Sequence, residues 1–116
     1  MAEPALSVVV PVYNDPDGVR ETLRSLTDQE SPSDRYEVLV VDNDSTDATP
    51  EVVSAFEARH PDVVVGLSET DIQSSYAARN TGIEHACADI IAFVDADMTV
   101  ESTWVDDILD ALDGSA

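Results

Sequence analysis

The sequence contains no lysine, and its only permanently charged cations are five arginines. They face 25 aspartates and glutamates, which gives the 116-residue chain a formal net charge of −20 at pH 7. Proteins that bind DNA or RNA neutralise phosphates with lysine and arginine, so this composition excludes a nucleic-acid partner. It also excludes charge-driven docking on an anionic membrane surface. A negatively charged ligand would need a metal ion, a helix N-terminus or one of the arginines to hold it.

Cysteine, long apolar runs and targeting segments are also scarce or absent. Cys87 is the only cysteine, which excludes an internal disulfide, and its place among alanines in a helical pattern predicts a small core residue. Nothing reaches the roughly 18 consecutive apolar residues of a membrane span, and the start of the chain lacks the features of a signal peptide. The sequence therefore predicts a cytoplasmic protein without a transmembrane segment.

The apolar residues that are present make up 43% of the chain and are strongly clustered. Such clusters predict a folded chain in spite of its charge, because disordered chains lack them. An acidic, lysine-free surface is typical of a protein adapted to high salt, since carboxylates stay hydrated and salt screens their repulsion. A halophilic protein is one interpretation, and an ordinary acidic protein is the alternative.

Four short apolar runs, most of them rich in valine or isoleucine, cover residues 6–12, 38–41, 63–67 and 90–94. A segment with helical period follows each run. Pro16 is expected to open the first helix, Thr49 to cap the second and Gly114 to end the last, while the third covers residues 74–88. This alternation predicts an α/β fold of one domain over residues 1–116: a three-layer α/β/α sandwich with a mostly parallel sheet.

Acidic side chains follow the ends of three predicted strands: Asp15, Asp42, Asp44, Asp95 and Asp97. Because ligands of parallel sheets bind beyond the carboxyl ends of the strands, we expect these side chains along one edge. Crowded carboxylates are tolerated where a divalent cation absorbs their charge, and Mg²⁺ and Mn²⁺ commonly share one or two carboxylates with phosphate oxygens. Asp95 and Asp97 form an Asp-x-Asp motif after a buried strand and are the candidate metal site, although such pairs also arise by chance in an acidic chain.

Four motifs occur in a fixed order: SVVVPVYN at residues 7–14, VDNDSTD at 41–47, ARNTG at 78–82 and FVDAD at 93–97. Together they resemble the nucleotide-sugar-binding N-terminal half of the family 2 glycosyltransferases. The resemblance implies the Rossmann-like GT-A fold with strand order 3-2-1-4. It also implies a transferase of the hexosyltransferase type, which moves a sugar from a nucleotide-diphosphate sugar, UDP-sugar above all, to an acceptor. Mn²⁺ or Mg²⁺ would assist, with inversion at the anomeric carbon.

The resemblance also implies roles for individual residues. The turn at residues 11–13 would line the nucleobase pocket, and Asp42 would accept a hydrogen bond from a uracil-type base. Arg79 would approach the base or the diphosphate, Asp95 would hold the ribose hydroxyls, and Asp97, with Asp95 beside it, would ligate the metal. The implied nucleotide-sugar-binding residues are Pro11, Val12, Tyr13, Asp15, Asp42, Asn43, Arg79, Asp95 and Ala96.

Two positions depart from the family's pattern. Asn43 stands where a second aspartate is frequent, and Asp44 stands where glycine is frequent. An asparagine side chain can still donate and accept hydrogen bonds, and aspartate tolerates a left-handed turn better than most residues. The resemblance therefore implies nucleotide binding more firmly than specificity for one nucleotide.

Few residues follow Asp97, whereas the family's acceptor-binding half, with the carboxylate that acts as general base, lies beyond this point. We therefore expect a donor-binding half-domain that is truncated or works with a partner, and the sequence assigns no general base. The strand at 90–94 would then lie at an open sheet edge, which predicts a homo-oligomer formed through this edge or through the last helix. The alternative function is a catalytically incomplete module that binds a nucleotide diphosphate and a metal.

Overall fold

The four apolar runs form one parallel sheet in the computed structural model, which describes residues 3–112. The strands are β1 (Leu6–Val12), β2 (Tyr36–Asp42), β3 (Val64–Ser68) and β4 (Ile90–Phe93), and the helices are α1 (Pro16–Thr27), α2 (Thr49–Arg59), α3 (Ser75–His85) and α4 (Trp104–Leu112). The strand order is β3-β2-β1-β4, and every neighbouring pair is parallel. The predicted α/β architecture and strand order are confirmed.

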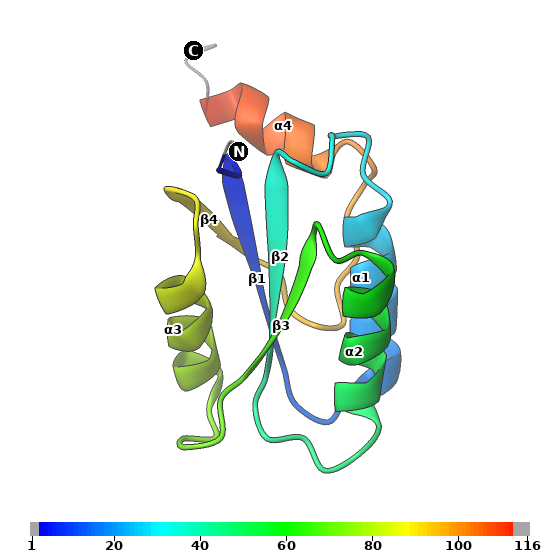
Figure 1. Ribbon diagram of the computed structural model, residues 1–116, viewed down its shortest axis with the longest axis vertical. Coiled ribbons are helices and arrows are strands. Elements are labelled where there is room, and N and C mark those ends of the chain that lie inside the picture. Colours follow the sequence, from blue (N-terminus) through cyan, green and yellow to red (C-terminus); the bar gives the residue numbers. More distant parts are fainter. Residues whose placement is uncertain (1–2, 113–116) are drawn as a thin grey trace.

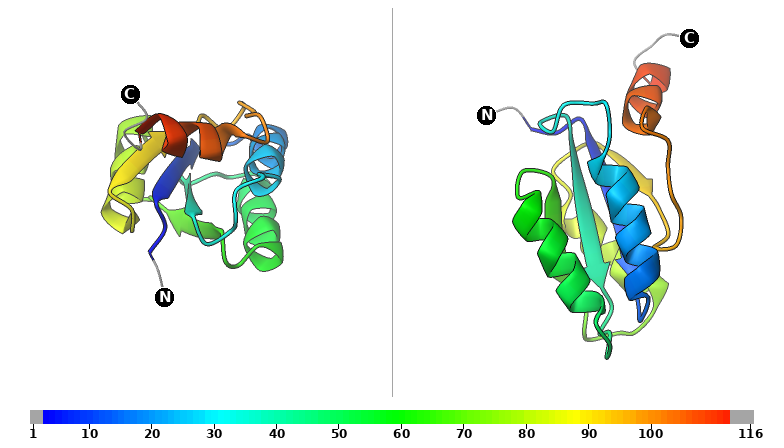
Figure 2. Two further views of the ribbon diagram at one scale, coloured as in Figure 1. Left: turned by 90° about the horizontal axis from the view of Figure 1, so that it is seen from above. Right: turned by 90° about the vertical axis from the view of Figure 1, so that its right-hand side faces the viewer.

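Helices cover both faces of the sheet (Figure 1). Helices α1 and α2 lie on one face and α3 on the other, while α4 crosses the end of the sheet at which the strands begin (Figures 1 and 2). The larger core cluster, which includes Val8 and Val40, lies beneath α1, α2 and α4. The smaller cluster, which includes Val9 and Val41, packs against Ala78 of α3. Alternate residues of β1 and β2 therefore pack on opposite faces, as the continuous apolar runs predicted.

Helix α3 lies close against the sheet because it has a glycine where it crosses β1. A Cβ atom added at Gly82 would lie only 2.4 Å from Cγ1 of Val9. Real Cβ atoms do not approach other atoms this closely, so glycine permits the short separation between helix and strand. The same helix begins with Ser75, beside the carboxyl ends of the strands, so its position bears directly on the loops gathered there.

The starts of α1 and α2 are fixed by side-chain hydrogen bonds. Asp15 is the N-cap of α1, and its Oδ1 accepts from the amide of Gly18 at 3.0 Å. The N-cap of α2 is Ala48 rather than the predicted Thr49, which is already helical. The amide and hydroxyl of Thr49 both donate to Asp47 Oδ1, at 2.9 and 2.6 Å, so aspartate supplies the acceptor just outside the helix.

The prediction of a core position for Cys87 is wrong. Helix α3 ends at His85 rather than near residue 88, because the backbone of Ala86 is extended, with φ −65° and ψ 134°. Cys87 therefore lies beyond the helix, where its side chain is exposed and its amide donates to Glu37 Oε2 at 2.7 Å. The helix end predicted at Gly114 lies outside the described residues.

Strand β4 is an outer strand of the sheet, and within residues 3–112 no further strand pairs with its free edge. Phe93 at its end is 46% exposed. These features agree with an open edge, and the predicted self-association stays a prediction. No described helix has both the length and the apolar character needed to cross a membrane.

Candidate functional site

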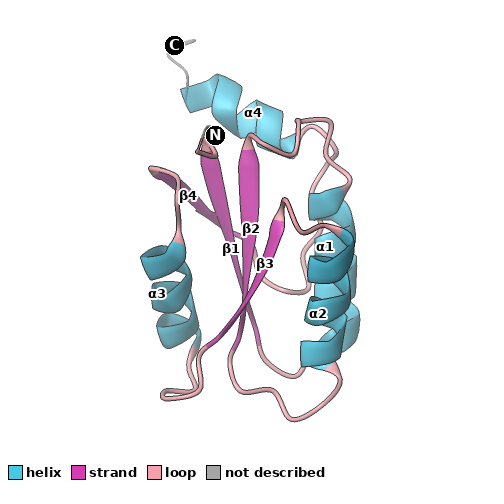
Figure 3. Cartoon of the chain, viewed as in Figure 1, coloured by secondary structure: helices cyan, strands magenta, loops and turns pink. Residues whose placement is uncertain are grey.

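The loops that follow the strands gather at one end of the sheet (Figure 3). A pocket of about 150 Å³ lies at this end. Its lining comes from the ends of β1 and β2, from α3 and from the turn after β4, and consists of Pro11, Val12, Tyr13, Asn43, Ser75, Ala78, Asp95 and Ala96. Six of the predicted nucleotide-sugar-binding residues therefore meet at one pocket. Asp15, Asp42 and Arg79 do not line it.

A wider hollow, of about 650 Å³, lies at the opposite end of the sheet. It is lined by Pro4, Ser33, Asp34, Tyr36, Glu37, Pro61 and Asp62. None of the predicted site residues is among them, and the charged side chains are all acidic. Because ligands of parallel sheets bind at the carboxyl ends of the strands, the smaller pocket is the candidate site.

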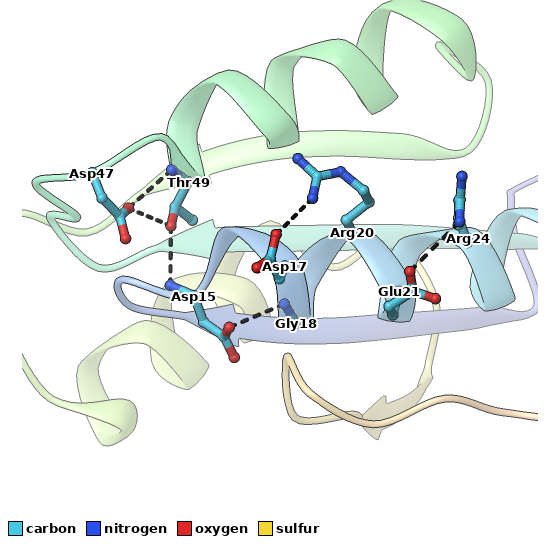
Figure 4. A network of polar contacts seen from close by, with 8 residues as sticks. All are labelled: Asp15, Asp17, Gly18, Arg20, Glu21, Arg24, Asp47 and Thr49. Carbon is cyan, nitrogen blue, oxygen red and sulfur yellow. Dashed lines mark hydrogen bonds and ion pairs between the residues drawn. The ribbon is translucent and has the colours of Figure 1, made fainter.

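The turns after β1 and β2 are tied together and form one wall of the pocket. The amide of Asn14 donates to Ser45 Oγ at 2.9 Å, and Asn14 Oδ1 accepts from the amide of Thr46 at 2.8 Å. The amide of Asp15 donates to Thr49 Oγ1 at 3.1 Å (Figure 4). Asp15 thus serves as a cap and a link between the two turns, rather than as part of the pocket lining.

Both turns contain a residue with left-handed backbone. Asn14 has φ 48° and Asp44 has φ 66°, and these are the two non-glycine residues with positive φ in the described part of the chain. Such a conformation costs a non-glycine residue on the order of 1 kcal/mol, least for asparagine and aspartate. The turn after β2 therefore has the geometry that explains why glycine is frequent at the position of Asp44 in the resembled family.

Asp42 lies at the same edge as the pocket but serves a different hollow. It continues the row of Val38 and Val40, which packs toward α1 and α2, and it lines a hollow beside α2. Its carboxylate is largely buried, with Oδ2 3.4 Å from the amide of Ser45 and Oδ1 without a partner among the described residues. Because successive strand residues face opposite sides, Asn43 rather than Asp42 lines the pocket.

The side-chain amide of Asn43 has a defined orientation. Its Nδ2 donates to the carbonyl oxygens of Glu69 and Ile72, both at 2.9 Å. Since both partners can only accept, the nitrogen must face them, and Oδ1 must face away. Asn43 itself lines the pocket, so the two hydrogen bonds of Nδ2 fix the orientation of a polar side chain at the pocket wall.

The loop at residues 69–72, whose carbonyls hold Asn43, is itself fixed by the side chain of Glu69. Its Oε1 accepts from the hydroxyl of Thr81 on α3 at 2.7 Å, and its Oε2 accepts from the amides of Asp71 and Ile72 at 2.9 and 3.2 Å. These hydrogen bonds, that of Thr81 first, hold the pKa of Glu69 below its ordinary value. Glu69, which no sequence pattern singled out, holds the loop at residues 69–72 in place against α3.

Two exposed carboxylates, those of Asp95 and Asp97, flank the buried Ala96. Arg79 Nη2 lies 3.6 Å from Asp95 Oδ1, and its guanidinium is 5.9 Å from the ring centroid of Phe93. Among the residues described, no group of three or more histidine, cysteine or acidic side chains could hold a metal by itself. The donor set nevertheless fits Mg²⁺ or Mn²⁺, which combine one or two carboxylates with the oxygens of a bound phosphate.

Thr22 on α1 is a second residue that the sequence analysis missed. It is fully buried, and its hydroxyl lies 2.7 Å from the carbonyl oxygen of Ala96 and 2.5 Å from that of Met98. The available signal was a polar residue next to Leu23 within an apolar helical stripe. Only the tertiary structure shows that this hydroxyl reaches the turn that carries Asp95 and Asp97.

The chain is similar to named proteins of known family. Residues 7–115 match Glycosyl transferase family 2. Glycosyltransferase AglE of Haloferax volcanii is 39% identical over 112 residues, which are 97% of this chain and 36% of that protein. Poly(ribitol-phosphate) beta-glucosyltransferase of Bacillus spizizenii is 36% identical over 92 residues, 79% of this chain and 14% of that protein. The chain thus spans little more than a third, or less, of the length of these curated relatives.

Two solved structures have a similar fold. Mannosyltransferase PcManGT of Pyrobaculum calidifontis, in complex with GDP-Man and Mn²⁺, superposes with a TM-score of 0.76 at 36% identity, over 84% of this chain and 29% of that one. S. aureus TarS 1-349, in complex with UDP, gives a TM-score of 0.84 at 29% identity, over 93% of this chain and 32% of that one. These likenesses confirm the GT-A fold, and with the match over nearly its whole length the chain belongs to glycosyl transferase family 2.

Proposed function

We propose that this chain binds the nucleotide-sugar donor of a glycosyltransferase in the pocket at the carboxyl ends of its strands. The observation that carries the proposal is that all four sequence motifs contribute to this one pocket, through Tyr13, Asn43, Ala78 and Asp95 among others. The named relatives are glycosyltransferases, and similar structures were solved with GDP-Man or UDP. The proposed reaction transfers the sugar to an acceptor, with inversion at the anomeric carbon.

Asn43 takes the role of the base contact, in place of Asp42. Its Oδ1 is an acceptor of fixed direction, because Nδ2 is held by two carbonyl oxygens. Uracil and guanine present a ring N–H to such an acceptor, whereas cytosine and adenine present an unprotonated ring nitrogen at the equivalent edge. The pocket should therefore prefer UDP or GDP to CDP or ADP, with a UDP-sugar as our proposed donor. Tyr13, which is 47% exposed beside the pocket, offers a ring against the base.

Asp95 and Asp97 are the residues that would hold Mn²⁺ or Mg²⁺ together with the diphosphate. When bound, the cation supplies positive charge that stabilises the diphosphate as it leaves the sugar. Arg79 adds a second positive charge at the same place and is the one arginine that contacts a pocket residue in the described part of the chain. In a chain of net charge −20, these two sources of positive charge make anion binding possible.

Catalysis also requires a general base that deprotonates the acceptor hydroxyl as it attacks the sugar. No residue that lines the pocket is assigned this role. We propose that residues 1–116 form the donor-binding domain. Other parts of the glycosyltransferase, outside these residues, would bind the acceptor and supply the general base. The length of the relatives, of which this chain spans 14–36%, supports this division of roles.

Isothermal titration calorimetry with UDP, GDP, CDP and ADP, each with and without Mn²⁺, tests the proposal. We expect Mn²⁺-dependent binding of UDP or GDP, on the order of tenfold tighter than CDP or ADP, and loss of this preference in Asn43→Ala. Equal binding of all four nucleotides, or binding of none, would contradict the proposal. Release of UDP from a UDP-sugar by the same sample would indicate an enzyme, whereas binding without turnover would indicate a binding module.

A further inference from the structure

The segment between β4 and α4 carries Asp95 and Asp97 but contains no helix or strand. From residue 94 to residue 103 the chain runs through turns and irregular backbone. Peptide groups in such a segment lack the hydrogen bonds of a helix or a sheet, and those that are buried need other partners. What holds this segment therefore determines where the two carboxylates lie.

Helix α1 supplies those partners through a row of polar side chains. Thr22 and Ser25, three residues apart, lie on one side of α1, and Gln29 follows two residues after the helix ends. Ser25 Oγ accepts from the amide of Val100 at 3.2 Å, and Gln29 Nε2 donates to the carbonyl of Glu101 at 2.7 Å. The row therefore follows the segment along its length, with Thr22 at the end nearest the Asp-x-Asp motif.

Thr22 makes the contacts that bear on the motif itself. Its hydroxyl lies 2.5 Å from the carbonyl oxygen of Met98, 2.7 Å from that of Ala96 and 3.4 Å from that of Asp95. A hydroxyl carries one proton, so the three acceptors share one donor, which is fully buried. Loss of that donor would leave the carbonyl of the buried Ala96 without this partner, and the turn would have to move for that carbonyl to reach water.

We propose that Thr22 is a positioning residue for the Asp-x-Asp turn: by binding the carbonyls of Ala96 and Met98, it fixes Asp95 and Asp97 for a nucleotide diphosphate and its divalent cation. The inference rests on the proposed function, because it takes these two carboxylates as the ligand-holding groups. Both carboxylates are exposed, so they gain little from packing of their own. The position of their backbone is then the main constraint on their separation.

Two substitutions at Thr22 and one at a matched residue test this inference. Thr22→Val keeps the shape of the side chain but removes the donor, and Thr22→Ser keeps the donor. Thr27→Val is the control, because Thr27 lies on the same helix and its hydroxyl donates within that helix, to the carbonyl of Leu23 at 2.7 Å. Amide hydrogen exchange reports the turn without any ligand, at the amide of Met98, which donates to the carbonyl of Asp95 at 3.0 Å.

We expect Thr22→Val to accelerate exchange at Met98 about tenfold and to weaken Mn²⁺-dependent UDP binding about tenfold. Thr22→Ser and Thr27→Val should stay within about twofold of the unaltered chain in both measurements. The inference is overturned if Thr22→Val binds UDP like the unaltered chain, whether or not exchange at Met98 changes. A failure of the proposed function has a different signature, since the unaltered chain itself would then bind no UDP, and this inference would fall with it.

Discussion

Replacing Gly82 by alanine tests how closely α3 packs against the sheet. Alanine has the higher helix propensity, so the substitution would stabilise an unpacked helix by about 1 kcal/mol. In this chain the new Cβ would lie 2.4 Å from Cγ1, 3.0 Å from Cγ2 and 3.2 Å from Cβ of Val9. Val9 is fully buried and β-branched, so it has little freedom to move aside. Since overpacking costs about 1–3 kcal/mol and the propensity gain offsets about 1 kcal/mol of it, we expect a net loss of up to about 2 kcal/mol in the free energy of unfolding.

The effect of Gly82→Ala on the free energy of unfolding should change sign once Val9 is shortened. In a Val9→Ala background the methyl groups that clash are absent, so Gly82→Ala should stabilise the chain by up to about 1 kcal/mol. The two sites would then be coupled by about 1–3 kcal/mol, the overpacking cost that the shorter side chain relieves. Urea unfolding followed by circular dichroism at constant salt measures all four chains, and Asn80→Ala on α3 serves as the control for helix propensity alone. Equal effects of Gly82→Ala in both backgrounds would refute the close approach.

Three further predictions concern stability. Asp15→Ala removes the acceptor that caps α1 and should lower the free energy of unfolding by about 1 kcal/mol, whereas Asp15→Ser should cost clearly less; equal losses would show that the cap contributes nothing. Thr81→Val removes the first hydrogen bond that lowers the pKa of Glu69. Because the pKa of Glu69 is lower in the folded chain than the value of about 4.3 in the unfolded chain, the ionised carboxylate stabilises the fold at pH values above that unfolded pKa. This stabilisation is lost as the pH falls through the folded pKa. The urea midpoints of the variant and the unaltered chain should therefore differ at neutral pH and converge in acid. Molar KCl, which shortens the screening length to about 3 Å, should raise the unfolding midpoint of this acidic chain, and an unchanged midpoint would contradict salt adaptation.

The fold could be predicted from sequence because β1 and β2 are buried on both faces and all four strands occur as short, continuous apolar runs. The strand order itself came from the resemblance to a family and not from the runs. The pocket could be predicted from sequence for a related reason. Residues that follow parallel strands meet at one edge of the sheet, and Tyr13, Asn43 and Asp95 lie together there as expected. Family 2 glycosyltransferases share these motifs, and the match over residues 7–115 confirms that reading.

What the sequence did not reveal has local or tertiary causes. Asp42 and Asn43 are adjacent, and only the parity of β2 decides which of them faces the pocket. Cys87 was expected in a helix that ends two residues before it. Thr22 is 74 residues from Ala96 in sequence, so no local pattern could reveal their hydrogen bond. Predictions that depend on one residue of register or on a long-range polar contact require the structure.

The most direct test of the account is calorimetric titration of UDP, with and without Mn²⁺, into the unaltered chain, Asp97→Asn and Asp34→Asn. Asp34 is an exposed aspartate at the opposite end of the sheet, so its substitution removes the same charge away from the pocket. We predict Mn²⁺-dependent binding that Asp97→Asn weakens by about tenfold or more, the scale of a lost charge-assisted contact, and that Asp34→Asn leaves unchanged. Binding that does not depend on Mn²⁺, or that the two variants affect equally, would contradict the assignment of this pocket.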